Sequence, residues 1–346
     1  MTNGLTIFKT QSLIDATIHI TIYTTISFGS YQRLSAIVLV LLWSLFACQA
    51  LASDSFRIVS QNMYRFFDDV DNGKKFETVL PTKNFHEKAT LAAQKIIIDF
   101  ELPDIMALQE VENLNSLNHI IHRIQQTSNV KYKAVLHEGN DVSGMDIGFL
   151  IKSEYRIQSI KQLFKKSQLA LNNSPLFSRP PLLIKVCNQS NCISVLNLHL
   201  RSMRGIRSKS KGHRVRDKRL QQASVIARWI DQYQRSHFGQ SLMVTGDLNA
   251  LSPPDQHIDV VGTIIGNPDN QNTKLSSKDL IKHDLIDLTL RIPHKKRYSY
   301  IHNKNKQVID YMIVNQGFKP RLEHIWFSQI DYDFSDHAGL IADFSW

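Results

Sequence analysis

Short apolar runs that end in polar residues recur along this chain. Residues 242–244 (Leu-Met-Val) form one such run, which predicts a buried strand ended by a Thr-Gly pair. Asp247 and Asn249 follow, and side chains two residues apart on an extended chain point the same way. Carboxylate and amide oxygens suit hard cations, and a carboxylate can orient a water molecule for hydrolysis. An Asx turn explains a lone Asp-x-Asn equally well, so the functional interpretation depends on the other segments.

The same pattern predicts strands at 56–62, 104–108, 193–198, 308–314 and 338–344. Polar residues that end, interrupt or precede these strands are Asn62, Glu110, His199, Asp310 and the pair Asp336-His337. Each has an ordinary structural explanation, such as a turn asparagine, a surface glutamate or a core histidine. Asp310 lies inside a strand and needs a partner, because an unpaired buried carboxylate is costly. The joint occurrence of all these residues is much less expected than any one of them.

Apolar residues at helical spacing predict helices over 85–100, 115–126 and 215–233, and further strands are expected at 132–136 and 147–151. Strand 308–314 is expected to pair with 297–300 across a turn at 302–307, and residues 252–282 to cross the surface as a long loop.

Residues 34–52 are the one strongly apolar segment of the chain. Arg33 precedes it and Ala-Leu-Ala ends it, a pattern typical of a secretory signal peptide cleaved before Ser53. The alternative is a membrane anchor through 34–52, since the run is nearly long enough to span a bilayer. We favour cleavage, which predicts a secreted or periplasmic protein without a transmembrane span. Residues 1–32 are long for a leader and suit an upstream start codon. The predicted organisation is therefore a leader over 1–52, with the signal peptide at about 33–52, and one functional domain over 53–346.

Two cysteines remain after the proposed leader. Cys187 and Cys192 bracket four turn-forming residues between two apolar runs, which predicts a hairpin with a cysteine on each arm. In an exported protein they are expected to form a disulfide, and in a reduced cytosolic protein they would be free thiols.

Charge indicates an anionic partner. The 346 residues carry a formal net charge of +10, or +9 without residues 1–52, which hold two basic residues and one acidic residue. Such a balance favours nucleic acid or an acidic membrane surface as partner. The run 201–219 is densely basic, and Arg201 and Arg204 within it are expected to contact substrate phosphates. The ordinary alternative for such a run is a solvated surface.

The segments SQNM, LQEVEN, LNLHL, GDLNA, IDYMIV and SDH, in this order over 56–346, resemble the endonuclease/exonuclease/phosphatase superfamily, whose fold is that of DNase I. The resemblance implies a four-layer α/β/β/α sandwich of two mostly antiparallel sheets. It places the active site at one edge, where strands of both sheets end.

The resemblance also implies a role for each polar residue. Asn62, Glu110 and Asp336 match metal-site positions, with Glu110 as the main ligand. Asp247 and Asn249 match residues that orient the nucleophile and hold the phosphate, and Asp310 matches the acid that pairs with the catalytic histidine, here His337. His199 matches a position expected to contact phosphate oxygen or assist the leaving group. Mg²⁺ is the default metal, with Mn²⁺ or Ca²⁺ as substitutes. No His/Cys cluster suggests catalytic zinc.

These observations predict an exported, divalent-metal-dependent phosphodiesterase that cuts DNA or RNA as a monomer. One alternative is a phosphoesterase of the same fold that acts on phospholipid, as sphingomyelinases do, or on inositol phosphates. The lack of a long apolar hairpin for membrane insertion weakens the lipid hypothesis. A second alternative is a catalytically silent secreted binding protein, which would have no reason to keep His337 and Glu110 together.

Overall fold

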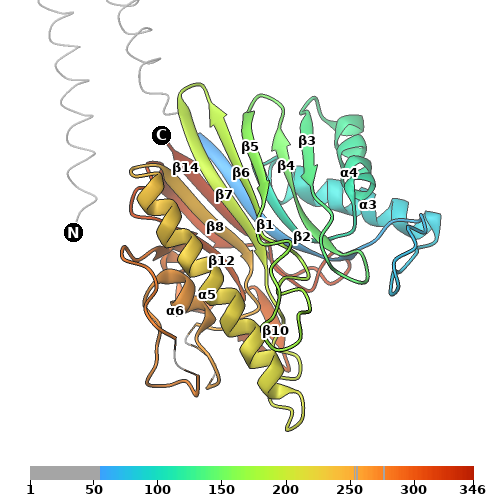
Figure 1. Ribbon diagram of the computed structural model, residues 1–346. Coiled ribbons are helices and arrows are strands. Elements are labelled where there is room, and N and C mark those ends of the chain that lie inside the picture. Colours follow the sequence, from blue (N-terminus) through green and yellow to red (C-terminus); the bar gives the residue numbers. More distant parts are fainter. Residues whose placement is uncertain (1–54, 253, 255, 276) are drawn as a thin grey trace, which may run out of the picture. The chain divides into compact units, whose positions relative to one another are not determined.

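Two six-stranded sheets form the centre of the fold (Figure 1). The first sheet has the strand order β13-β14-β1-β2-β4-β3. Its strands are β1 (Ser55–Phe66), β2 (Ile105–Val111), β3 (Tyr132–Leu136), β4 (Asp146–Lys152), β13 (Arg321–Phe327) and β14 (Leu340–Ser345). Strands β1 and β2 run parallel, and the other pairs of this sheet are antiparallel.

The second sheet has the order β5-β6-β7-β8-β12-β9. Its strands are β5 (Arg156–Gln162), β6 (Leu182–Asn188), β7 (Asn191–His199), β8 (Ser241–Asp247), β9 (Ile286–Asp287) and β12 (Asp310–Val314). Only β7 and β8 are parallel among the pairs of this sheet in the described residues. A separate hairpin consists of β10 (Tyr300–His302) and β11 (Asn305–Gln307).

Helices cover the outer face of each sheet. The described helices are α3 (Thr82–Ile98), α4 (Leu114–Thr127), α5 (Gly212–Ser236) and α6 (Val260–Ile265), with short 3-10 helices η1 (Leu288–Arg291) and η2 (His294–Lys296). In Figure 1, α5 and α6 lie on the side of β8 and β12, and α3 and α4 lie on the side of β3 and β4. The structure describes residues 55–252, 254, 256–275 and 277–346, so the proposed leader, 1–52, lies outside it.

Three hydrophobic cores separate the four layers. Because successive strand side chains point to opposite faces, Ile58 enters the core between the sheets while Val59 packs under α3 and α4. Met243 and Val244 on β8 divide in the same way between the inter-sheet core and the core under α5 and α6. The expected four-layer sandwich of two sheets is confirmed. Within the described residues, no helix combines the length and apolar character needed to cross a membrane.

A buried amide network joins the two sheets. Asn197 on β7 donates from Nδ2 to the backbone carbonyls of Leu108 and Gly148, at 2.9 and 3.0 Å. Its Oδ1 accepts a hydrogen bond from Gln109 Nε2 at 2.8 Å. Buried polar groups need such partners, so this network favours one alignment of the sheets.

Two expectations about local structure are wrong. Strand 308–314 does not pair with 297–300: the hairpin is formed by β10 and β11, and β12 pairs with β8 and β9. All residues from Ile309 to Val314 are buried. A strand of this kind needs neighbouring strands and packed layers, which an isolated hairpin does not provide. The excursion 252–282 contains the helix α6, which Asp259 caps by accepting the Gly262 N–H.

Cys187 and Cys192 form a disulfide across the β6–β7 hairpin, as the sequence predicted. The two residues are directly opposite each other in the antiparallel register. The hairpin is therefore closed twice, by backbone pairing and by a covalent bond.

Replacing both Cys187 and Cys192 with alanine should destabilise the protein by about 2 kcal/mol, the loop-closure value for a ring of this size. Urea unfolding of the double variant and the oxidised parent measures the difference. Equal midpoints would show that the hairpin is held by its backbone pairing alone.

Candidate active site

Strand register places three ionisable residues in a row at one end of the second sheet. Asp247, the last residue of β8, lies directly opposite His199 on β7 and Asp310 on β12. His199 Nε2 is 3.5 Å from Asp247 Oδ2. All three side chains are buried. Residues that are far apart along the chain therefore meet at one point.

His337, just before β14, joins this row from the first sheet. Its Nδ1 lies 2.8 Å from Asp310 Oδ2, and its Nε2 lies 4.0 Å from Asp247 Oδ2. Asp247, Asp310 and His337 each offer a ligand-type atom within 4.8 Å of the others. The Tyr300 ring packs beside the imidazole with centroids 5.1 Å apart, and the backbone N–H of His337 donates to Ser335 Oγ, which fixes the main chain of this residue. The imidazole is thus held on several sides.

Two amides fix the Asp247 carboxylate. Asn62 Nδ2 and Asn249 Nδ2 each donate to Asp247 Oδ2 at 3.1 Å, and the Asn249 backbone N–H donates to Oδ1 at 2.8 Å. Asn249 has a φ of 49°, in the left-handed region that asparagine tolerates better than most residues. This turn brings its side chain back toward the carboxylate.

Glu110 lies where β2 loses its pairing with both neighbouring strands. Between Asn62 and Phe66, β1 places three residues opposite this single residue, and the register with β4 also skips it. Its φ of 57° is left-handed, which costs about 1–2 kcal/mol for a residue with a Cβ. Glu110 Oε2 accepts the Arg65 N–H at 2.9 Å, and Oε1 lies 3.8 Å from His199 Nε2. The bulge therefore turns this carboxylate toward the group around Asp247.

Several ionisable side chains of the site have pKa values that are shifted away from their usual ranges. Burial, and next the charge of Asp310, raise the pKa of Asp247 to about 7. Burial lowers the pKa of His337, but the charge and hydrogen bond of Asp310 outweigh it and raise the pKa to about 10. Burial also raises the pKa of Asp336; His337 opposes this shift and Glu110 adds to it. An imidazolium therefore sits among carboxyl groups that repel one another.

His199 is the neutral imidazole of the site. Burial, followed by the charge of Arg179, lowers its pKa well below the usual value. Its Nδ1 is buried without a hydrogen-bond partner among the described residues. The sequence interpretation missed Arg179, which precedes β6 and pairs with Asp141 at 2.8 Å. Its one signal was a Ser-Arg-Pro-Pro segment before an apolar run.

The basic run 201–219 is only partly a solvated surface. Arg201 is half-buried and bonds Ser202 Oγ, while Arg204 is exposed in the same loop. Arg219 is buried, and its Nη1 donates to the carbonyls of Arg201 and Asn249, at 2.5 and 2.8 Å. Arg219 therefore ties together the chain segments that follow β7 and β8.

Lys88 is a further residue that sequence reasoning missed. It lies on α3, one helical turn after the buried Phe85, and its Nζ donates to the carbonyls of Tyr64 and Arg65. Burial lowers its pKa to about 8, and the charge of Glu110 opposes this shift. A lysine next to the apolar stripe of the predicted helix was the available signal.

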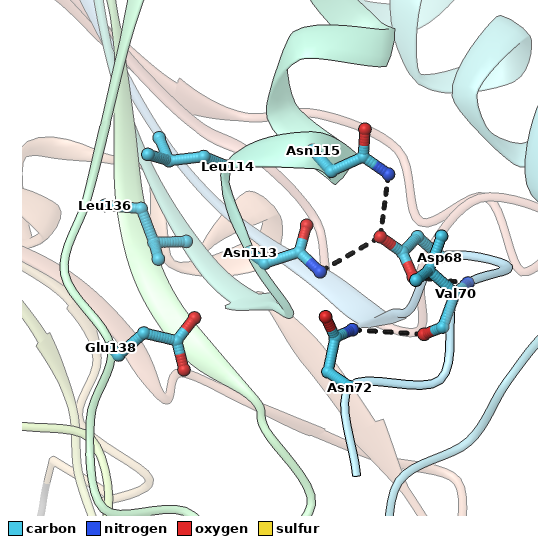
Figure 2. Close-up of a pocket in the computed structure, with 8 residues that line it drawn as sticks. All are labelled: Asp68, Val70, Asn72, Asn113, Leu114, Asn115, Leu136 and Glu138. Atoms are coloured by element: carbon cyan, nitrogen blue, oxygen red, sulfur yellow. Dashed lines mark hydrogen bonds between the residues drawn. The ribbon is translucent and has the colours of Figure 1, made fainter. Parts of the chain in front are cut away.

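A separate acidic hollow of about 350 Å³ lies beside the N-terminus of α4 (Figure 2). Asp68 is buried there, and its Oδ2 accepts from the side-chain amides of Asn113 and Asn115. Its Oδ1 accepts the Val70 N–H. Since both oxygens are already bonded, Asp68 anchors the loop after β1 rather than extending the site.

The structure gathers nearly all the residues predicted from the sequence. The gathered residues are Asn62, Glu110, His199, Asp247, Asn249, Asp310, Asp336 and His337. Asp336 lies at the rim, with Oδ1 4.0 Å from His337 Nε2. Arg201 borders the group through the chain after His199, and Arg204 lies further along that loop.

Comparison with known proteins shows the family of this chain. Residues 58–327 match the sequence profile of the Endonuclease/Exonuclease/phosphatase family. The chain belongs to this family, whose members are hydrolases of phosphoric esters. A search of curated protein sequences found no match.

Solved structures show the same fold at low sequence identity. A humanized D. rerio TDP2 is 16% identical, with a TM-score of 0.55, over 85% of this chain and 100% of that chain. A Bacteroides vulgatus endonuclease/exonuclease/phosphatase is 14% identical, with a TM-score of 0.54, over 84% and 98%. ANGEL2, described as a 2',3'-cyclic phosphatase, is 13% identical, with a TM-score of 0.53, over 85% and 96%.

Asp310→Asn should flatten the dependence of stability on pH above neutrality. The pKa of His337 is raised to about 10 when folded, against about 6.5 when unfolded. The stability that this histidine contributes is therefore complete below about pH 6.5 and is lost as pH rises toward 10, by at most about 1.4 kcal/mol per pH unit. Urea unfolding in EDTA between about pH 7 and 9.5 should show a smaller decline in the variant.

Asp287→Asn is the matched control, since Asp287 is also a buried carboxylate but bonds Thr289 instead of a histidine. Its decline should match that of the parent protein. If the stability of Asp310→Asn fell with pH as steeply as that of the parent protein, the His337–Asp310 interaction would be contradicted.

Proposed function

We propose that this protein is an exported, divalent-metal-dependent phosphodiesterase that hydrolyses nucleic acid. The observation that carries the proposal is the convergence of Asp247, Asp310 and His337 on one point, with Glu110 beside them. Export rests on the signal-peptide pattern before Ser53 and on the Cys187–Cys192 bond, which an oxidising compartment favours.

The residues present suit a hard divalent cation. Asn62, Glu110 and Asp336 would hold the ion through side-chain oxygens, which are the ligands that Mg²⁺ prefers and that Mn²⁺ or Ca²⁺ also accept. The raised pKa values of Asp247 and Asp336 reflect the burial and crowding of carboxylates, which a cation would relieve. When bound, such an ion supplies positive charge against the phosphate oxygens.

The chain's own groups divide the proton transfers. Asp247, with a pKa near 7 and both oxygens oriented by amides, suits a base that takes a proton from the attacking water. His337, protonated and held by Asp310, stabilises negative charge and can donate a proton as the phosphorus–oxygen bond breaks. Groups whose environments push their pKa values apart commonly take such paired roles. Neutral His199 is suited to hydrogen-bond a phosphate oxygen.

We favour nucleic acid as the substrate because cationic residues border the site. Burial, and next the charge of Arg179, lowers the pKa of both His199 and Arg201, so Arg179 lies close to the site; Arg204 and Lys218 extend the positive charge. Lysine and arginine contacts to phosphates dominate nucleic-acid affinity. A structure of D. rerio TDP2 is described as a complex with single-strand DNA product, at 15% identity and a TM-score of 0.53. That complex makes a nucleic-acid strand a reasonable substrate to test first.

Incubation with plasmid DNA, RNA, sphingomyelin vesicles and inositol phosphates, each with Mg²⁺ or EDTA, tests the substrate class. We expect nucleic acid to be cleaved in Mg²⁺ and not in EDTA. His337→Ala should lower kcat by about 10²–10⁴-fold. Hydrolysis of lipid with intact nucleic acid would refute the nuclease proposal, and full activity of His337→Ala would refute the assigned site.

Arg204→Ala should weaken nucleic-acid binding and reduce the slope of log affinity against log salt by about 1, the value for one phosphate contact. Arg235→Ala removes the same charge from the far end of α5, where Arg235 pairs with Asp231, and serves as control. Fluorescence anisotropy with a labelled oligonucleotide in Ca²⁺ measures both. Equal losses of affinity in the two variants would show that only the net charge of the protein matters and that Arg204 makes no phosphate contact.

A further inference from the structure

The carboxylate of Glu110 depends on an unusual turn in the neighbouring strand. In β1 the bulge opposite Glu110 contains Tyr64 and Arg65, with φ values of 48° and 53°. Two successive residues with side chains in the left-handed region are disfavoured unless the surroundings hold them. The Arg65 N–H, aimed by this turn, donates to Glu110 Oε2 at 2.9 Å.

Lys88 bonds this turn from helix α3, in addition to the local hydrogen bonds from the Tyr64 N–H to Asn62 Oδ1 and from the Phe67 N–H to the Arg65 carbonyl. Its Nζ donates to the Tyr64 carbonyl at 2.6 Å and to the Arg65 carbonyl at 3.1 Å. The ammonium also lies 5.7 Å from the centre of the Tyr64 ring and 5.6 Å from that of Phe66, within cation–π range. These contacts connect helix α3 to both residues of the left-handed turn.

We propose that Lys88 is a positioning residue that sets the orientation of Glu110, and hence the affinity of the site for its divalent cation. The ammonium binds the two carbonyls of the turn, the turn presents the Arg65 N–H, and that N–H holds one oxygen of Glu110. The other oxygen is left facing the site, 3.8 Å from His199 Nε2. This inference rests on the metal-ligand role of Glu110 in the proposed function.

The sign of the effect separates positioning from simple charge. A lysine near a metal site repels the cation, so removal of its charge alone should strengthen metal binding. If Lys88 positions Glu110, its removal should weaken metal binding, because the carboxylate loses its fixed orientation. Groups that orient metal ligands typically change metal affinity by about 10–100-fold.

The test measures Mn²⁺ binding to the full protein by electron paramagnetic resonance, without substrate. Lys88→Met should weaken Mn²⁺ binding by about tenfold or more. Lys88→Arg keeps the positive charge and N–H donors for the two carbonyls, so it should lose less Mn²⁺ affinity than Lys88→Met. Lys83→Met is the matched control: Lys83 is on the same helix, exposed and paired only with Glu87 among the described residues, so it should not change binding.

A double-variant comparison identifies the route of the effect. Glu110→Gln should weaken Mn²⁺ binding, and adding Lys88→Met to it should cause little further loss if Lys88 acts through Glu110. Additive losses would overturn the inference. Circular dichroism establishes that each variant is folded, and Lys88→Gln replaces Lys88→Met if the latter is not.

Each outcome has a distinct meaning. Unchanged or tighter Mn²⁺ binding in folded Lys88→Met, with clear weakening in Glu110→Gln, would refute the role of Lys88 and leave the proposed function intact. Mn²⁺ binding that is independent of Glu110 in the parent protein would refute the metal site itself, and this inference with it.

Discussion

The site depends on the burial of two carboxylates, Asp247 and Asp310, directly opposite each other on β8 and β12. Like charges in such a cross-strand pair repel, and burial adds to the cost. The fold offsets this cost with local partners: the His337 imidazole bonds Asp310, and the amides of Asn62 and Asn249 bond Asp247. A buried group of this kind, costly to assemble and held by specific partners, is typical of a functional site.

The two sheets supply different parts of this arrangement. The second sheet sets the row of His199, Asp247 and Asp310 through strand register alone. The first sheet supplies Glu110 through an irregularity, a bulge in which backbone hydrogen bonding is interrupted. Bulges commonly re-aim side chains next to active sites. The inter-sheet network at Asn197 lies two residues before His199 and helps to keep the two contributions aligned.

Much of the fold was predictable because many of its strands are short apolar runs. The strands at 132–136 and 242–244 have sharp boundaries in the sequence, and both are present. The edge strands β5 and β13 were not predicted, since neither contains a fully buried residue and β5 is largely polar. The site residues that follow apolar runs were also predictable. Lys88 and Arg219 were not, because the sequence does not show that a charged side chain folds back onto backbone carbonyls.

Strand β7 carries the disulfide at one end and His199 at the other. His199 is seven positions after Cys192 on the extended chain, a span of about 23 Å. Oxidation or reduction of the disulfide therefore takes place far from the His199 imidazole, with paired β-sheet between the two. With the disulfide reduced, the turnover rate should be unchanged, while resistance to heat and proteolysis should fall. The two ends of a single strand therefore affect stability and catalysis separately.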